Sequence, residues 1–288
     1  MTQGNRIGII GAGTMGAGIA QVAAASGFEV ALIDTKDEFV ASGLQRIESG
    51  LQRLVGRERM SGEERDATLG RITTGTSMET LAGSELVIEA VVESFDTKVE
   101  VLRQVADVVD KTTILATNTS SISITALAAT VPNPERFAGM HFFNPVPVLK
   151  LVEVVRGLQT SDATAATIRE VAEQMGKTPA EVADMPGFAA NRILIPMINE
   201  AIFAVAEGVA SAEEIDMVMT LGASHPLGPL ALADLIGLDV CLHIMEVLHK
   251  DFGDDKYRPA PLLRQMVSAG RLGRKSGQGF HSYENPQS

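Results

Sequence analysis

The stretch RIGIIGAGTMGAGIAQVAAASGFEVALID, residues 6–34, decides how the chain folds. It opens with an apolar run, Ile7 to Ile10, that predicts a buried strand. A glycine-rich corner follows, then a helix of small residues that Gly27 closes, and a second apolar run that ends on Asp34. A strand, a tight turn, a helix and a second strand within about 30 residues form one βαβ unit.

Three glycines in this corner predict a dinucleotide site. Gly11 makes the turn, Gly13 lets a pyrophosphate approach the backbone, and Gly16 lets the helix pack closely on the strand. The diphosphate would rest on the free N–H groups and the positive dipole end of the helix. Such turns also occur without a nucleotide, but here the strand, the helix and the acid after the second strand are all present. We assign to the cofactor site Gly11, Gly13, Thr14, Met15, Gly16 and Asp34.

Asp34 favours NAD over NADP as the cofactor. Its carboxylate stands at the end of the second strand, where it can accept both ribose hydroxyls. A 2′-phosphate would meet that carboxylate, and Lys36 nearby weakens the preference without reversing it. We therefore predict NAD.

The composition limits the partners and the location of the protein. A net charge of −12 and a pI near 4.9 argue against nucleic acid or an anionic membrane as a partner. No apolar run reaches the roughly 18–20 residues of a membrane span. A first strand near Arg6 leaves no room for a signal peptide, so we expect a cytoplasmic protein. The single cysteine, Cys241, allows no disulfide within the chain and no metal site, and its apolar surroundings predict a small buried side chain.

Strands and helices alternate along the first part of the chain. Apolar strand patterns, separated by helical ones, recur at 85–92, 112–117, 136–140, 150–155 and 179–182. This alternation predicts an α/β fold, with a doubly wound, mostly parallel sheet of the Rossmann type. Beyond Met185-Pro186-Gly187 the pattern is helical only. The length suits two domains, which we place at 1–186 and 187–288.

His141 is the leading candidate for a catalytic base. In open α/β sheets ligands bind outside the carboxyl ends of the strands. Asp34, Glu93, Ser120 and His141 all follow predicted strands at those ends, as does the glycine turn. Oxidation of an alcohol with NAD needs a base for the hydroxyl proton, and an imidazole suits both directions of that transfer. A lone histidine is more often structural, and we interpret the other four histidines in that way.

Glu153 and two neutral residues could complete this site. Glu153 interrupts an apolar run, where a buried carboxylate is costly without a partner. A carboxylate that accepts the other ring N–H of His141 would fix the tautomer of the ring and stabilise the imidazolium. The alternative is an acid that faces solvent from a half-exposed strand. Ser120 and Asn191 could hold the substrate oxygen, and their alternatives are a loop hydroxyl and a helix-start cap.

Three arginines form a candidate anion-binding surface. Arg46, Arg53 and Arg57 lie along one stripe of the helix predicted from residue 37, if that helix continues far enough. The alternative is a solvated helix face, because Glu48 and Glu58 lie nearby.

Motifs along nearly the whole chain resemble one family. They are GxGTMGxGIA, NTSS at 118–121, HFFNPVPVLKLVEV from His141, PGFAANRI from Pro186, HPLGPL from His225 and GRKSGQGF from Gly273. In this order they resemble the short-chain L-3-hydroxyacyl-CoA dehydrogenase family, most closely its bacterial 3-hydroxybutyryl-CoA dehydrogenases. The sequence GFHSY departs from the family's more usual GF-Tyr pattern, which leaves His281 without a role.

The resemblance implies a set of roles and an architecture. The Rossmann-type domain would be followed by a helical domain that closes over the substrate and forms a homodimer. His141 would be the base and Glu153 its orienting carboxylate, while Ser120 and Asn191 would hold the substrate. Four residues would surround the nicotinamide half of NAD, together with Ser120: Glu93, Lys98, Asn144 and Lys275. Arg53 and Arg57 would meet the CoA phosphates, where lysines are common in the family.

We therefore expect a reversible, NAD-linked oxidation of a short-chain (3S)-3-hydroxyacyl-CoA to the 3-oxoacyl-CoA. One alternative is a dehydrogenase on the same scaffold that acts on a longer, dicarboxylic or branched hydroxyacyl-CoA or on a free hydroxy acid. A second alternative is a non-catalytic NAD-binding protein. Such a protein need not retain a base, its carboxylate and two polar substrate-holding residues together.

Overall fold

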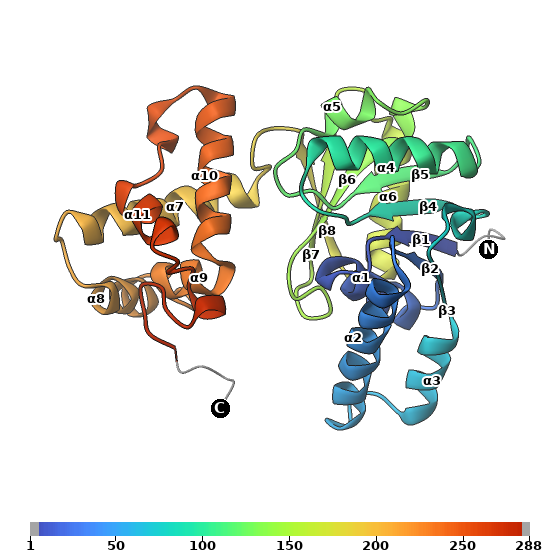
Figure 1. The fold of residues 1–288 in the computed structure, drawn as a ribbon, viewed down its shortest axis with the longest axis horizontal. Helices are drawn as coiled ribbons and strands as arrows, with labels where there is room; N and C mark the ends of the chain where they lie inside the picture. The colour runs from blue at the N-terminus through green and yellow to red at the C-terminus, as the bar shows by residue number, and fades with distance from the viewer. Residues whose placement is uncertain (1–5, 284–288) are drawn as a thin grey trace. The chain divides into compact units, whose positions relative to one another are not determined.

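The structure is a computed structural model that describes residues 6–283 (Figure 1). The chain forms two compact units and passes from the first to the second between Asp184 and Met185. The first unit contains the sheet, and the second is built from helices. Within the described residues no helix combines the length and the apolar character needed to cross a bilayer. The cytoplasmic location stays a prediction.

The first unit is organised around an eight-stranded sheet with the strand order β3-β2-β1-β4-β5-β6-β7-β8. The strands from β1 to β6 pair in parallel, β7 runs antiparallel to β6, and β8 is parallel to β7. This confirms the predicted doubly wound, mostly parallel sheet. The strands are β1 (Arg6–Ile10), β2 (Glu29–Ile33), β3 (Ile72–Gly75), β4 (Leu86–Glu89), β5 (Ile114–Thr117), β6 (Phe137–Phe142), β7 (Leu151–Arg156) and β8 (Thr178–Ala183).

Helices cover both faces of this sheet. The helix α1 presents buried alanines to one face, where α6 also packs, and α2 packs behind α1. On the other face Ile124 of α5 contacts the sheet at Gly139, and α4 packs beside α5 (Figure 1). The helices are α1 (Thr14–Ala25), α2 (Asp37–Val55), α3 (Gly62–Gly70), η1 (Met78–Leu81), α4 (Phe95–Val108), α5 (Ile124–Ala128), η2 (Pro134–Arg136) and α6 (Asp162–Gln174).

Two strand boundaries differ from the prediction in a way that matters for function. The predicted strand 85–92 is wrong at its end, because β4 stops at Glu89. The N–H of Val91 bonds to the Glu89 carboxylate at 2.7 Å instead of continuing the ladder, so Glu93 lies in a loop. Conversely, β6 extends to Phe142, which places His141 inside that strand and not after it.

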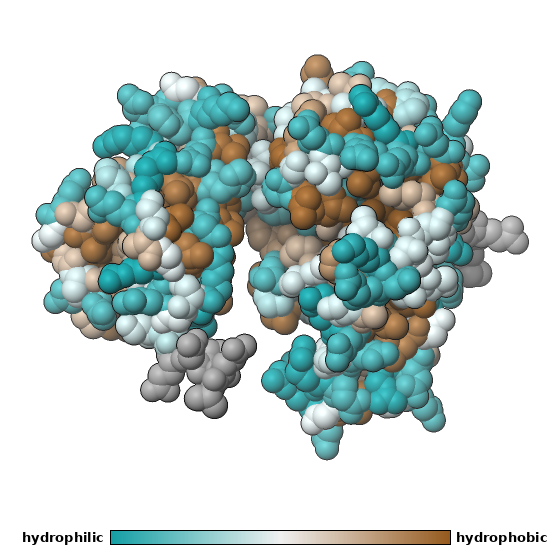
Figure 2. Space-filling view, in the orientation of Figure 1, coloured by the Kyte–Doolittle hydropathy of each residue, from teal (hydrophilic) through white to brown (hydrophobic). Residues whose placement is uncertain are grey.

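The second unit has a separate helical core. Ile198 and Ile202 of α7 pack with Leu238 and Met245 of α10, and all four are essentially buried. Apolar side chains remain among the charged ones on its surface (Figure 2). The helices are α7 (Ala190–Ala206), α8 (Ala212–Met217), the π-helical turn η3 (Val218–Gly222), α9 (Pro229–Ile236), α10 (Leu238–Phe252), η4 (Asp255–Tyr257), α11 (Pro261–Ser268) and η5 (Arg274–Ser276).

Asp234 ties the closing segment of the described chain to this core. Its carboxylate, 1% exposed, accepts the backbone N–H groups of Phe280 and His281 at 3.0 and 2.9 Å and the Tyr283 hydroxyl at 3.0 Å. His281 Nε2 lies 2.8 Å from Oδ2 of Asp216. His281, which had no predicted role, therefore helps to fasten the segment.

Candidate active site

The candidate site lies at one edge of the sheet. Because β1, β2, β4, β5 and β6 are parallel, their carboxyl ends meet at the same edge. The glycine turn and Asp34 follow β1 and β2, and Ser120 follows β5. His141 is the penultimate residue of β6. The glycine turn, Asp34, Ser120 and His141 therefore share one rim.

The turn between β1 and α1 fits the diphosphate of a dinucleotide. Gly11 has a φ of +98°, and a Cβ on Gly16 would lie 1.7 Å from the Gly11 carbonyl oxygen. A Cβ on Gly13 would meet no atom within 4 Å, so this side of the turn is open. Gly13 contributes no side chain to cap α1, and the first turn of α1 holds no acid. The first N–H groups of the helix are thus suited to an anion.

Asp34 completes this turn from the end of β2. Its Oδ2 accepts the Ala12 N–H and its Oδ1 accepts the Thr35 N–H, both at 2.7 Å. Oδ1 also accepts the Thr35 hydroxyl at 3.3 Å. Oδ2 has a second lone pair beside the one that accepts the Ala12 N–H, so the fixed carboxylate can still accept a ribose hydroxyl. Met15, in contrast, packs against the core of the sheet.

A cleft of about 470 Å³ opens beside α1 and α2. Its lining includes Thr14, Gly18, Arg46, Arg53, Asn144 and Val146. Arg46 also donates from Nη1 to the Ala12 carbonyl oxygen at 3.4 Å. The helix α2 ends at Val55, so Arg57 lies outside it and is not among the residues that line the cleft. Two of the three arginines therefore share this cleft.

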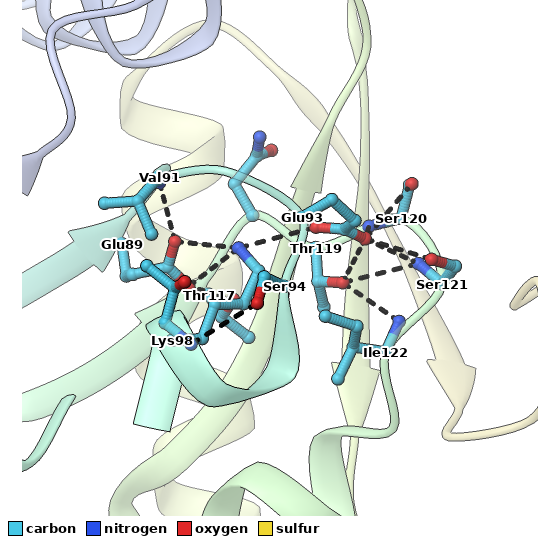
Figure 3. Close-up of polar contacts among 12 residues, drawn as sticks. Glu89, Val91, Glu93, Ser94, Lys98, Thr117, Thr119, Ser120, Ser121 and Ile122 are labelled. Carbon is cyan, nitrogen blue, oxygen red and sulfur yellow. Dashed lines mark hydrogen bonds and ion pairs between the residues drawn. The ribbon is translucent and has the colours of Figure 1, made fainter. Parts of the chain in front are cut away.

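A buried ion cluster joins the ends of β4 and β5 (Figure 3). Lys98 Nζ lies 2.7 and 3.0 Å from the two carboxylate oxygens of Glu89, and both side chains are fully buried. The Thr117 hydroxyl donates to Glu89 Oε2 at 2.6 Å. Lys98 Nζ also lies 3.4 Å from Oε2 of Glu93. A lysine with no exposed surface is thus held between two acids.

Glu93 connects this cluster to Ser120. Its Oε1 accepts the Ser120 N–H at 2.9 Å, the Thr119 hydroxyl at 2.5 Å and the Ser121 hydroxyl at 3.1 Å. Partial burial raises the pKa of Glu93, but the Lys98 charge and these hydrogen bonds outweigh it, so the pKa lies below its usual value. Glu93 therefore stays an anion at neutral pH and fixes the loop that carries Ser120.

His141 and Glu153 form a buried pair. They are directly opposite each other in the antiparallel ladder of β6 and β7. His141 Nδ1 lies 2.8 Å from Glu153 Oε2, and the two side chains are 8% and 2% exposed. When Nδ1 donates this bond, the neutral ring keeps its acceptor lone pair on Nε2. The contact expected from the sequence is present.

Two predicted residues lie in the second unit. Asn191 is the second residue of α7 and is 8% exposed. The N-cap of this helix is Ala189, so Asn191 is not the cap considered as its alternative. Lys275, in η5, lies 2.7 Å from Oδ2 of Asp239 at the start of α10.

Glu89 is not among the site residues predicted from the sequence. It shows the same sequence pattern as Glu153, because its carboxylate lies inside an apolar run, LVIEAVV at 86–92. A fully buried acid of this kind requires a partner, and Lys98 is that partner.

Models of one protein family match almost the whole chain. Residues 6–185 match the 3-hydroxyacyl-CoA dehydrogenase NAD-binding domain, and residues 187–283 match the 3-hydroxyacyl-CoA dehydrogenase C-terminal domain.

Named relatives agree with these models over their full length. A probable 3-hydroxybutyryl-CoA dehydrogenase of Deinococcus radiodurans is 55% identical over 96% of this chain and 100% of its own. One of Bacillus subtilis is 52% identical over 98% of this chain and 99% of its own. The crystal structure of (S)-3-hydroxybutyryl-CoA dehydrogenase from Ralstonia eutropha superposes with a TM-score of 0.96 at 51% identity, over 98% of this chain and 100% of that one.

Proposed function

The chain belongs to the 3-hydroxyacyl-CoA dehydrogenase family, and from this premise we propose that its catalytic centre is the rim around His141. The protein is an NAD-dependent oxidoreductase that interconverts a 3-hydroxyacyl-CoA and the 3-oxoacyl-CoA. We propose a short (3S)-3-hydroxyacyl group, 3-hydroxybutyryl, as its preferred substrate, in line with the names of the relatives.

The buried pair of His141 and Glu153, at 2.8 Å, is the observation that carries the proposal. Because Nδ1 donates to Glu153, Nε2 takes the hydroxyl proton during oxidation and returns it during reduction. The Glu153 carboxylate holds the ring in this tautomer and stabilises the imidazolium that forms. NAD bound at this rim would supply the hydride acceptor for oxidation, and NADH the hydride donor for reduction. Ser120 and Asn191 orient the substrate oxygen by hydrogen bonds.

Phosphate recognition is the second part of the proposal. Arg53 lines the cleft together with Arg46, and in a chain with a net charge of −12 two guanidinium groups there favour a polyanion. We assign the CoA phosphates to these two arginines, with Arg57 as an outer contact. Around the nicotinamide half of the cofactor we keep the roles implied by the resemblance, for Glu93, Lys98, Asn144 and Lys275.

Turnover of two variants tests the catalytic pair. His141→Ala should lower kcat by about 10²–10⁴, and Glu153→Gln by a comparable factor because the amide can donate to Nδ1 and fix the wrong tautomer. The Kd for NADH should stay within about twofold of wild type. The matched control is His249→Ala, since His249 also faces an acid, Asp255, but at the surface. Near-normal turnover of His141→Ala would remove this residue from the mechanism.

Substrate choice separates a CoA-dependent enzyme from one that acts on free acids. Arg53→Ala should raise the KM for acetoacetyl-CoA by roughly tenfold, the effect of losing one charge-assisted contact. Arg169→Ala, which changes an exposed arginine on α6, is the control. Equal turnover of acetoacetate and acetoacetyl-CoA would favour the free acid, and a panel of 3-oxoacyl-CoA esters with NADH defines the preferred chain length.

We further propose that the protein is a homodimer through its helical unit. Met217, at the end of α8, and Val218 and Leu221, in η3, lie within five residues of sequence and are 52%, 63% and 79% exposed. Large apolar side chains that cluster at a surface favour burial against a partner. Leu221→Glu should reduce the dimer in sedimentation velocity, whereas Leu158→Glu, at an 87% exposed position of the first unit, should not. A wild-type monomer at micromolar concentration would contradict this assignment.

A further inference from the structure

We propose that Glu89 is a positioning residue for the nicotinamide end of the cofactor site and that the negative charge of its cluster favours the oxidised cofactor over the reduced one. The cluster consists of Glu89, Lys98 and Glu93 (Figure 3). This inference rests on the proposed placement of the cofactor along the rim of the sheet.

The strand order shows which end of a dinucleotide meets the cluster. Asp34 lies at the end of β2 and the glycine turn at the end of β1. A dinucleotide whose ribose meets Asp34 and whose diphosphate meets the turn continues in the direction from β2 to β1. The next strands in the sheet are β4 and β5, which end at Glu89 and Thr117. The second half of the dinucleotide, the nicotinamide half, therefore approaches the cluster.

Glu89 fixes the geometry of the cluster. Both of its oxygens contact Lys98 Nζ, one also accepts the Val91 N–H, and the other also accepts the Thr117 hydroxyl. These four contacts join β4, the loop after it, β5 and α4. Lys98 in turn reaches Glu93, whose other oxygen holds the Ser120 loop. Glu89 thus acts through Lys98 and Glu93 on the residues at the rim.

The charges of the cluster do not cancel. One ammonium faces two carboxylates, so the group carries one negative charge in excess, and two of its three members have no exposed surface. Solvent screens such charges less than it screens surface charges. The oxidised nicotinamide ring is a cation and the reduced ring is neutral. Removal of one carboxylate charge should therefore weaken binding of the oxidised form selectively.

Binding of three ligands to Glu89→Gln tests this inference by calorimetry. The amide keeps the shape of the side chain and removes one charge. The ratio of the Kd for NAD⁺ to the Kd for NADH should rise several-fold, because the lost unit charge interacts with the cationic ring at an effective dielectric constant of about 20. The Kd for ADP-ribose, which lacks the nicotinamide, should change by less than about twofold.

Two controls separate charge from structure. Glu85→Gln removes a charge from the exposed residue directly before β4, and Thr117→Val removes a hydrogen bond to Glu89 without removing a charge. Neither should change the ratio for NAD⁺ and NADH. If Glu89→Gln does not fold, the same Kd ratio is measured for Glu93→Gln, which removes one negative charge from the partly exposed member of the cluster. An unchanged ratio, or a parallel loss for all three ligands, would overturn the inference.

A further variant, Asp34→Ala, tests separately whether the cofactor lies along the rim. Asp34→Ala should weaken ADP-ribose, NAD⁺ and NADH alike, because all three contain the adenosine half. If Asp34→Ala leaves ADP-ribose binding unchanged, the placement along the rim is wrong, whatever Glu89→Gln does. If Asp34→Ala behaves as expected and the ratio is still unchanged in Glu89→Gln, only the role of Glu89 is wrong.

Discussion

Two glycines of the first turn have opposite surroundings, and their alanine variants should fail in different ways. A Cβ on Gly16 would lie 1.7 Å from the Gly11 carbonyl oxygen, whereas a Cβ on Gly13 would meet nothing within 4 Å. Gly13 has a φ of −66°, which alanine adopts without strain. Gly16→Ala should therefore cost about 1–3 kcal/mol of stability or more. Gly13→Ala should stay within about 0.5 kcal/mol of wild type.

Gly13→Ala, which should hardly change stability, should weaken cofactor binding. A methyl group there occupies the side from which a diphosphate approaches the turn, so the Kd of Gly13→Ala for NADH should rise by at least about tenfold. Urea unfolding and NADH titration of the two variants provide both measurements. If Gly13→Ala is destabilised, or if it binds NADH normally, the Gly13 side of the turn is not the open side that receives the diphosphate.

The pKa of Glu93 predicts an acid-dependent part of the stability. The folded pKa lies below the ordinary value of 4.5, because the Lys98 charge and the hydrogen bonds outweigh the effect of burial. Between the folded pKa and 4.5 the unfolded chain binds more protons, so this contribution is complete above pH 4.5 and is lost as the pH falls through the folded pKa. The difference in Tm between wild type and Glu93→Gln should narrow from pH 7 to about pH 3.5. Glu100→Gln, at an exposed position of α4, should show no such narrowing.

Residue types and their spacing predicted the contact between His141 and Glu153 but not the one between Glu89 and Lys98. An acid inside an apolar strand required a partner, which is why Glu153 was paired with His141. Glu89 carried the same signal, yet its partner Lys98 lies one helical turn into α4, and sequence alone does not show that this lysine is buried. Arg57 does not share the helical stripe of Arg46 and Arg53 because α2 ends at Val55, and helix ends are weakly encoded.

At the level of elements, Asp184 holds the start of α5 from the end of β8. Its carboxylate accepts the Ile124 and Thr125 N–H groups at 3.0 and 2.8 Å and the Ser123 hydroxyl at 2.9 Å. Asp184→Ala leaves two N–H groups at a helix start without this acceptor, so it should cost about 1–3 kcal/mol in urea unfolding. Asp162→Ala, at the exposed start of α6, is the control and should cost less than about 1 kcal/mol. Equal losses of unfolding free energy in the two variants would mean that Asp184 does not stabilise the start of α5.

Strand patterns predicted the central strands of the sheet better than the edge strand β3. The apolar strands at the centre are buried on both faces, which gives them a continuous apolar sequence. The edge strand β3, with the sequence ITTG, is half exposed and largely polar, so it lacks that signal and was not predicted. The end of β4 was misplaced because Ala90, Val91 and Val92 continue the apolar pattern after the chain has left the ladder.

At the level of the whole molecule, the two units have separate hydrophobic cores, and the single cysteine reports on one of them. Cys241 lies in α10 with no exposed surface. Burial, together with the charges of Asp239 and Asp234, raises the pKa of its thiol to about 12. Since the thiolate is the reactive form, Cys241 should resist alkylation at pH 8.5 in the folded protein and react once the helical unit opens.

Pulse alkylation across a urea series can therefore show whether the units unfold independently. Leu263→Ala, in the helical core, and Leu32→Ala, in the sheet core, each remove a fully buried leucine side chain and should cost about 2–5 kcal/mol. With separate cores, Leu263→Ala should lower the urea concentration at which Cys241 becomes reactive, and Leu32→Ala should leave it unchanged. An equal shift in both variants would mean that the units unfold as one cooperative structure, because a defect in the sheet would then open the helical core as well.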